Sequence, residues 1–183
     1  TVLGGALTPY VSKKWMRALE IARESRLPYV SFVESAGADL RVKTDGDDKA
    51  GSSAASARVD HFAESGRFFH ELIELSKLEI PTLCVVFGSS TAGGAYQPGM
   101  SDYNIVIKKQ SKIFLAGPPL VKMATGEESD DEPLGGAQMH AEVSGLGEYL
   151  AEDERLGRKV VLEFLNCDLA SHVRDASTVG RQV

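Results

Sequence analysis

The stretch from Pro81 to Ser101 constrains the fold more than any other part of the chain. It opens with Thr82 to Phe87, an apolar and β-branched run that does not alternate with polar residues. Such a run is typical of a strand covered on both faces, as in a parallel sheet. The run ends at Gly88, and the small-residue segment Ser89 to Ala95 follows. The sequence therefore predicts a buried strand, a tight glycine turn and a short helix after Gly94.

A glycine turn that leads into a helix aims free backbone N–H groups outward. Such groups can bind an anion or stabilise a developing oxyanion. The same pattern also fits a tight turn in which Gly93 and Gly94 only allow close packing. From the residues alone, both interpretations stay open.

Composition places the chain among soluble globular proteins and excludes several functions. Its 183 residues suit about one domain, with 43% hydrophobic and 25% charged residues. A net charge of −6 argues against a nucleic-acid surface, and no apolar run has the length of a membrane span. The two widely spaced cysteines do not suggest disulfides, and the four histidines lack metal-ligand spacing, so no metal is expected. We therefore expect a reducing compartment, either the cytoplasm or the mitochondrial matrix.

Helical and strand patterns alternate along the chain, which predicts an α/β fold with a parallel sheet and right-handed crossovers. Ser12 is the expected N-cap of the first helix. Ligands in such sheets bind beyond the carboxyl ends of the strands. The small-residue turns at Glu34–Asp39 and Ser89–Ala95 both fall there. The predicted elements, in order, are a helix within Thr8–Arg26, a strand at Tyr29–Val33, a helix at Val59–Leu78, strands at Thr82–Phe87, Tyr103–Ile107 and Lys112–Leu115, and helices at Leu120–Thr125 and Leu150–Leu165.

Two segments have the composition of loops. Arg41 to Arg58 is rich in Gly, Ser and Asp and poor in apolar residues, so we expect a mobile loop. Gly126 to Pro133, GEESDDEP, is expected to be a solvated acidic loop. The chain begins at Thr1 without an initiator methionine, and we expect it to be a fragment of a longer protein.

The block from Gly88 to Gly147 carries a family resemblance. It contains GSSTAGGAYQPGMSDY and KIFLAGPPLVKMATGEESDDEPLGGAQMHAEVSGL, and the motif LGGALTP stands near the start of the chain. These motifs closely resemble the carboxyltransferase (β) subunits of biotin-dependent acyl-CoA carboxylases, in particular the methylcrotonyl-CoA and propionyl-CoA carboxylase branch. The resemblance implies a crotonase-like (ClpP/crotonase) fold, a spiral of strand-strand-helix units. It also implies that residues 1–183 form the N-terminal, acyl-CoA-binding half of a carboxyltransferase.

The resemblance further implies a reaction and its partners. A carboxyl group passes from carboxybiotin, carried on a partner's biotin carrier domain, to the enolate of an acyl-CoA. The implied partners are the acyl-CoA substrate, a biotin carboxylase/biotin carrier subunit and further copies of the chain, in a homo-oligomer that we expect to be a hexamer. In this family, biotin itself is thought to take the substrate proton.

The expected site consists of backbone amides that hold the thioester oxyanion. Gly93 and Gly94 are the catalytic donors expected at the helix start, and Ala38 is the second donor by similarity to the crotonase pattern. We expect Gly94→Val to reduce carboxylation far more than folding. Many relatives carry glycine at the position of Ala36, so a positive φ there would be difficult for this chain. The residues expected to contact substrate are Ala36, Gly37, Ala95 and Tyr96.

Three alternatives remain at this stage. A crotonase-type enoyl-CoA hydratase or isomerase uses the same oxyanion geometry with glutamate acid/base groups, but Gln97 stands where glutamate is frequent, and an amide cannot transfer protons as a carboxylate does. A serine peptidase would need a base beside Ser89 or Ser90, whose context is not G-x-S-x-G. The chain could also be a non-catalytic half that contributes only subunit contacts.

Overall fold

The computed structural model describes residues 3–38 and 66–152. The expected loop at Arg41–Arg58 lies outside these ranges, as does nearly all of the helix expected at Leu150–Leu165. The described helices and strands belong to a compact unit that covers Thr1–Leu150, with the last strand ending one residue later.

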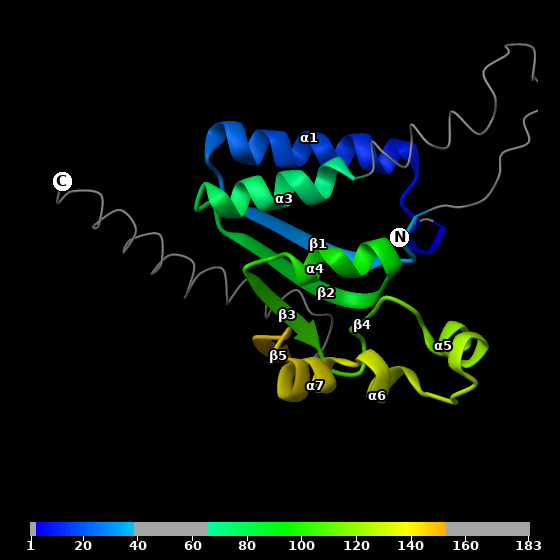
Figure 1. Cartoon of the computed structure of the whole chain (residues 1–183). Coiled ribbons are helices and arrows are strands. Elements are labelled where there is room, and N and C mark those ends of the chain that lie inside the picture. The colour runs from blue at the N-terminus through cyan, green and yellow to red at the C-terminus, as the bar shows by residue number, and fades with distance from the viewer. Residues whose placement is uncertain (1–2, 39–65, 153–183) are drawn as a thin grey trace, which may run out of the picture. The chain divides into compact units, whose positions relative to one another are not determined.

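A mostly parallel sheet forms the centre of this unit, as expected from the alternating pattern (Figure 1). Its order is β1-β2-β3-β5, and β4 pairs with the last part of β2. Strand β2 runs parallel to β1, β3 and β4. The strands are β1 (Tyr29–Ser35), β2 (Thr82–Thr91), β3 (Tyr103–Ile107), β4 (Lys112–Phe114) and β5 (Tyr149–Ala151).

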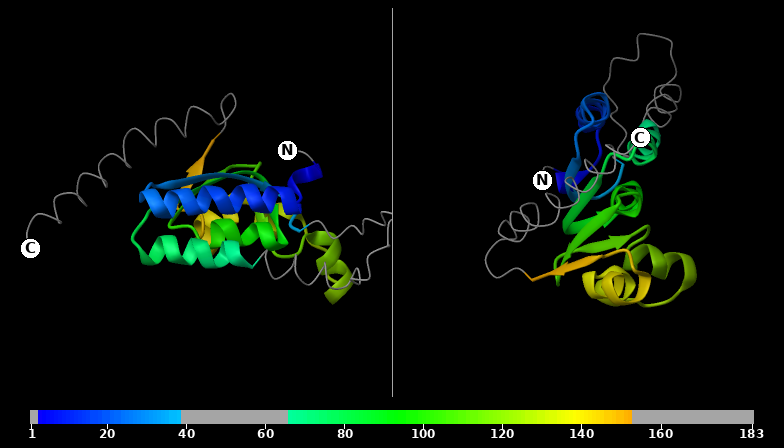
Figure 2. Two further views of the ribbon diagram at one scale, coloured as in Figure 1. Left: turned by 90° about the horizontal axis from the view of Figure 1, so that it is seen from above. Right: turned by 90° about the vertical axis from the view of Figure 1, so that its left-hand side faces the viewer.

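Two long helices, α1 (Pro9–Ser25) and α3 (Arg67–Lys77), run side by side next to β1 and β2 (Figures 1 and 2). Trp15 of α1 stacks on Phe68 of α3, with ring centroids 4.4 Å apart. The remaining elements are the 3₁₀ turns η1 (Leu3–Gly5) and η2 (Ala92–Ala95), the helices α4 (Tyr96–Gly99), α5 (Pro118–Thr125), α6 (Asp131–Gly135) and α7 (Ala137–Met139), and the π-helical turn η3 (His140–Ser144).

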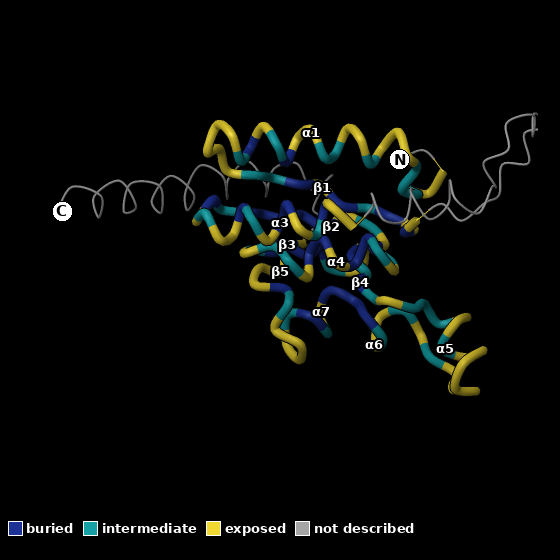
Figure 3. Tube along the Cα trace, turned by 45° about the horizontal axis from the view of Figure 1, so that its top comes forward, coloured by how far each residue is buried: buried dark blue, intermediate teal, exposed yellow. Residues whose placement is uncertain are grey.

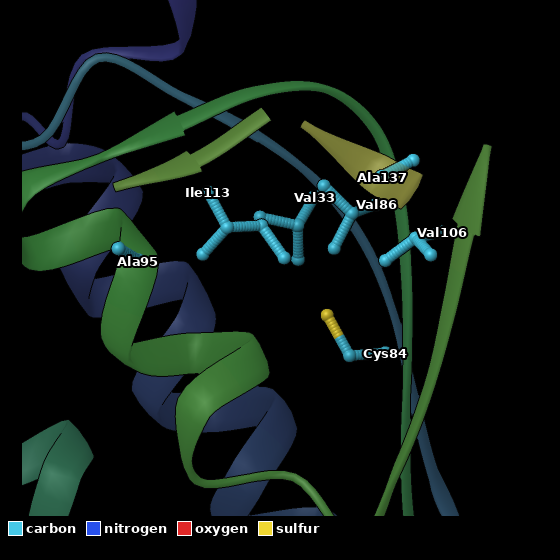
Figure 4. Packing of buried hydrophobic residues seen from close by; sticks show 7 residues of the cluster. All are labelled: Val33, Cys84, Val86, Ala95, Val106, Ile113 and Ala137. Atoms are coloured by element: carbon cyan, nitrogen blue, oxygen red, sulfur yellow. The ribbon is translucent and has the colours of Figure 1, made fainter. Parts of the chain in front are cut away.

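Two apolar clusters hold these elements together. One lies between α1 and α3 and includes Leu19, Leu72 and Leu75, all fully buried. The other lies on the sheet and gathers Val33, Cys84, Val86, Ala95, Val106, Ile113 and Ala137 (Figure 4). Strand β2 is therefore buried along most of its length, whereas α5 has no buried residue (Figure 3). The second cluster joins β1, β2, β3 and β4 directly beneath the end of β2.

Four sequence expectations are wrong in detail. Helix α1 is capped by Thr8, whose hydroxyl accepts from the Val11 N–H, because Pro9 at the first helical position sets the start before Ser12. Strand β2 does not stop at Gly88 but continues to Thr91. The acidic segment contains helix α6 from Asp131, and Leu150 lies in β5 rather than in a helix.

Candidate functional site

The site begins at an irregularity in the pairing of β1 with β2. Val33 pairs with Val86, but the next pair is Ser35 with Ser90, so β2 carries two more residues than β1 across this step. Such a bulge bends a strand and re-aims the residues after it. Gly88 lies within the bulge, where a Cβ would come 2.8 Å from Cγ and Oε1 of Glu34. The glycine that looked like a strand end therefore makes room for a neighbouring side chain.

The two small-residue turns meet at the carboxyl end of the sheet. Gly37 has a φ of +81°, and a Cβ built on it would lie 3.0 Å from the Ala92 Cβ and 3.1 Å from the Thr91 carbonyl oxygen. The same Cβ position is 3.6 Å from the Gly93 nitrogen. The turn after β1 is thus packed directly on the turn after β2, as the parallel arrangement of the two strands requires.

The peptide between Gly37 and Ala38 has a fixed orientation. The Gly37 carbonyl accepts a hydrogen bond of 2.8 Å from the Leu7 N–H. In a trans peptide the N–H points opposite to the C=O. The Ala38 N–H is therefore directed away from Leu7, and the Ala38 residue itself is exposed.

The turn η2 has no side-chain cap at its N-terminus. Thr91 occupies the N-cap position but makes no capping hydrogen bond. A threonine at this position normally accepts from a backbone N–H one turn ahead. Ala92, the first residue of η2, has a φ of 50°, which is uncommon for a residue with a Cβ. The start of η2 thus has the form of a helix N-terminus without a side-chain cap from Thr91.

Gly93 and Gly94 have different surroundings. A Cβ on Gly93 would meet nothing within 4 Å, whereas a Cβ on Gly94 would lie 2.6 Å from both Cβ and Oγ of Ser35. Neither residue has a positive φ. Gly94 is therefore required for close packing against β1, and Gly93 borders open space.

The other residues expected at the site differ in exposure: Ala36 and Tyr96 are exposed, and Ala95 is buried. Ala36 is exposed and does not have a positive φ, so an alanine at this position creates no backbone strain. Ala95 is 7% exposed and belongs to the core cluster, which leaves only its backbone for a ligand. Tyr96 is 46% exposed and packs edge-on against Phe69 of α3, with ring centroids 5.1 Å apart.

Sequence reasoning missed three hydroxyls that lie at the two turns. The sequence analysis treated them only as small residues. Each hydroxyl in fact forms a hydrogen bond with a backbone group of the turns, and the three residues are Ser35, Ser90 and Thr91. Ser and Thr side chains at the end of a strand commonly bond nearby backbone groups in this way. Their placement two or three residues before Gly37 and Gly93 was the signal that could have identified them.

The structure bears on two of the alternatives, a serine peptidase that would use Ser90 and a hydratase that would need an acid/base group at Gln97. The Ser90 hydroxyl is fully buried and donates to the Gly94 carbonyl, so Ser90 is not an exposed nucleophile. Gln97 lies in α4 with 9% exposure and carries an amide where a hydratase would need a proton-transferring group. Among residues 3–38 and 66–152, no cluster of three or more His, Cys, Asp or Glu side chains could hold a metal ion, and no helix of that part has the length and apolarity to cross a membrane.

The buried thiol of Cys84 lies in the core cluster below the site. Burial raises the pKa of the Cys84 thiol from 9.0 to about 12, and a hydrogen bond with Ser31 opposes part of this shift. Because the neutral thiol is the favoured form in the folded state, Cys84 contributes stability below pH 9.0 that is lost as the pH rises toward about 12.

We expect Cys84 to be unreactive in the folded protein, because the thiolate is the nucleophilic form and burial disfavours it. In a Cys167→Ser variant, Ellman's reagent near neutral pH should label Cys84 slowly in buffer and rapidly in denaturant. Rapid labelling of the folded protein would contradict the burial of this thiol.

The sequence matches known proteins along most of its length. Residues 1–172 match the family described as the carboxyl transferase domain. The chain is 53% identical over 165 residues to a probable biotin-dependent acyl-coenzyme A carboxylase β2 subunit of Mycobacterium tuberculosis, covering 88% of this chain and 28% of the relative. It is 46% identical over 187 residues to a probable mitochondrial methylcrotonoyl-CoA carboxylase β chain of Drosophila melanogaster, covering 100% of this chain and 30% of the relative. The chain therefore spans less than a third of the length of these curated relatives.

Solved structures support the same assignment. The β subunit of geranyl-CoA carboxylase from P. aeruginosa matches with a TM-score of 0.68 and 43% identity, covering 87% of this chain and 28% of that one. A transcarboxylase 12S structure, described as a hexamer assembly, matches with a TM-score of 0.66 and 27% identity, covering 82% of this chain and 26% of that one. The expected crotonase-like α/β fold is thereby confirmed. With nearly its whole length matched, this chain belongs to the carboxyl transferase domain family.

Proposed function

We propose that this chain is the N-terminal, acyl-CoA-binding part of a biotin-dependent acyl-CoA carboxyltransferase. The observation that carries the proposal is the contact between the two turns, where the Gly37 Cβ position lies 3.0 Å from the Ala92 Cβ. This contact brings the Ala38 N–H and the N–H groups of η2 to one edge of the sheet. Family membership supports the reaction class, since the two curated relatives above are named as carboxylase β subunits.

The proposed role of these backbone groups is to stabilise the enolate of the acyl-CoA. Removing a proton next to the thioester carbonyl moves negative charge onto its oxygen. Donors from Ala38 on one side and from Gly93 and Gly94 on the other would hold that oxygen, each contributing about 3–4 kcal/mol if it behaves like other oxyanion donors. Ala36, Gly37, Ala95 and Tyr96 would border the acyl group and the thioester.

The open space in front of Gly93 supports this orientation. A Cβ there would meet no atom within 4 Å, whereas Gly94 is covered by Ser35. A substrate would therefore approach the turn from the Gly93 side, with Gly94 behind it.

The carboxyl donor fits this site as a group delivered by a partner. Carboxybiotin on the carrier domain of a biotin carboxylase/carrier subunit supplies the activated carboxyl group. The residues found here suit that division of labour, because the turns offer backbone donors while Gln97 offers an amide instead of a general base. We include in the proposal that the full-length protein is a homo-oligomer and acts in the cytoplasm or the mitochondrial matrix.

The test is a carboxylation assay of the full-length protein with its biotinylated partner. Acetyl-, propionyl-, methylcrotonyl- and long-chain acyl-CoA would be supplied with bicarbonate and ATP. We expect carboxylation of at least one of them, dependent on the biotin carrier. Hydration of an enoyl-CoA without the carrier, or no reaction with any substrate, would contradict the proposal and favour a hydratase or a non-catalytic half.

A further inference from the structure

The two turns are joined by one side-chain hydroxyl, that of Thr91, at the place where the ladder of the sheet is interrupted. The Thr91 hydroxyl donates to the Ser35 carbonyl oxygen at 3.1 Å, which links the end of β2 to the end of β1. This link comes directly after the bulge at which the register jumps from Val33/Val86 to Ser35/Ser90. A bulge leaves residues unpaired and weakens the ladder locally. The hydroxyl therefore provides a cross-strand tie beyond the last regular pair.

The Ser35 hydroxyl fixes the turn that contains the first donor. Its oxygen accepts from the Gly37 N–H at 3.1 Å, and its O–H donates to the Gly5 carbonyl at 3.0 Å. The Gly37 carbonyl is in turn held by the Leu7 N–H. Both peptide planes that flank Gly37 are thus fixed, including the plane that carries the Ala38 N–H.

The Ser90 hydroxyl fixes the second turn. It is fully buried and donates to the Gly94 carbonyl at 2.9 Å. The bond reaches from the last part of β2 across η2, so it sets how η2 folds back on the strand. Removal of this hydroxyl would take one hydrogen bond from the Gly94 carbonyl, which would keep its bond from the Tyr96 N–H.

We propose that the hydroxyls of Ser35, Ser90 and Thr91 are positioning groups that set the distance and angle between the two donor turns. The proposal rests on the carboxyl-transfer function proposed above. An oxyanion site is effective because its donors are already oriented before charge develops. Here the donors are backbone groups on two separate turns, so their relative placement depends on the groups that join the turns. The Thr91 hydroxyl makes that connection, and the Ser35 and Ser90 hydroxyls fix the turn on each side of it, without touching the substrate.

Thr91 offers the sharpest test because both an isosteric and a conservative replacement exist. Thr91→Val removes the hydroxyl and keeps the shape, and Thr91→Ser keeps the hydroxyl. We expect Thr91→Val to lower kcat by about 10- to 10²-fold with a much smaller change in KM, as for a misplacement of about an ångström at a reacting centre. Thr91→Ser should recover most of the turnover. Ser90→Ala should behave like Thr91→Val.

Ser31→Ala is the matched control. Ser31 lies on β1 four residues before Ser35, is 6% exposed, and its hydroxyl bonds the Leu83 carbonyl at 3.4 Å, away from the turns. Ser31→Ala and Thr91→Val should both lower Tm by a few degrees, as expected for the loss of one hydrogen bond. Only Thr91→Val should lower kcat.

A second measurement tests the oxyanion donors through ligand binding, without the carboxylation reaction. Equilibrium binding of propionyl-CoA would be compared with that of S-propyl-CoA, which lacks the carbonyl oxygen. We expect the parent protein to prefer the thioester and Thr91→Val to lose most of that preference, while Ser31→Ala retains it.

The outcomes separate this inference from the proposed function. A parent protein that neither carboxylates an acyl-CoA nor prefers the thioester overturns the proposed function itself. A parent that does both, with Thr91→Val and Ser90→Ala unchanged in kcat and in thioester preference, overturns only the positioning role. If Thr91→Val and Ser90→Ala do not fold, low turnover of a folded Thr91→Ser would overturn the role of the hydroxyl, and near-parent turnover would support it.

Discussion

Gly94→Val is expected to lower carboxylation by about 10²- to 10³-fold, because the added side chain would turn the Gly94 N–H away from the thioester oxygen, with the effect of losing one oxyanion donor. The structure adds a cost to folding that the sequence did not predict. The Cβ of any replacement would lie 2.6 Å from both Cβ and Oγ of Ser35, and Ser35 holds the neighbouring turn through Gly5 and Gly37. Overpacking of this kind typically costs about 1–3 kcal/mol. Turnover and Tm, measured on one preparation of the full-length protein, should therefore both fall.

Gly93→Ala separates the two effects. A Cβ on Gly93 meets nothing within 4 Å and Gly93 has no positive φ, so this variant should unfold within a few degrees of the parent. Its methyl group would project into the space proposed for the thioester, and we expect turnover to fall by at least about tenfold. If Gly93→Ala carboxylates like the parent, or if Gly94→Val melts and turns over like the parent, η2 is not the oxyanion site.

Strands β1, β2 and β3 were predictable because burial leaves a direct trace in the sequence. The apolar run from Thr82 becomes β2, and the β-branched segments at Tyr29 and Tyr103 become β1 and β3. In a sheet covered by helices, continuous apolar runs reflect the need to bury both faces. The same reasoning placed both turns at one edge, and the contact between Gly37 and Ala92 agrees with it.

The structural role of each glycine could not be predicted from the sequence. Gly88 resembles a strand end, but it lies in a bulge and gives space to Glu34. The left-handed conformation at the start of η2 belongs to Ala92 and not to Gly93 or Gly94. A glycine indicates either unusual φ or close approach, and only the neighbouring atoms distinguish the two.

The place of the hydroxyls shortly before the glycines is visible in the sequence, but their hydrogen-bond partners are not. Ser35, Ser90 and Thr91 share a small size with the alanines around them, and a pattern of small residues does not reveal which polar groups are buried. Ser90 bonds Gly94 only four residues on, but Thr91 donates to the carbonyl of Ser35 and Ser35 donates to that of Gly5, which are distant in the sequence. Such contacts depend on the register of β1 against β2, which includes a bulge that local sequence does not specify.

Gly37→Ala is expected to have the second large effect. Gly37 combines a φ of +81° with a Cβ position 3.0 Å from the Ala92 Cβ. An alanine must therefore adopt the left-handed region, at about 1–2 kcal/mol, and must also push against η2. We expect carboxylation to fall by about 10²-fold as the two turns separate.

Gly126→Ala provides the matched control, because Gly126 has nearly the same φ, +80°, but a Cβ there would meet nothing within 4 Å. Both variants carry the backbone strain, and only Gly37→Ala carries the contact with η2. The free energy of unfolding, measured with denaturant, should therefore fall further for Gly37→Ala, by roughly 1–3 kcal/mol beyond the control. Turnover should stay near the parent value in Gly126→Ala. Equal losses of stability and activity in both variants would mean that left-handed strain alone explains Gly37, and the packing of one turn on the other would then have no part in catalysis.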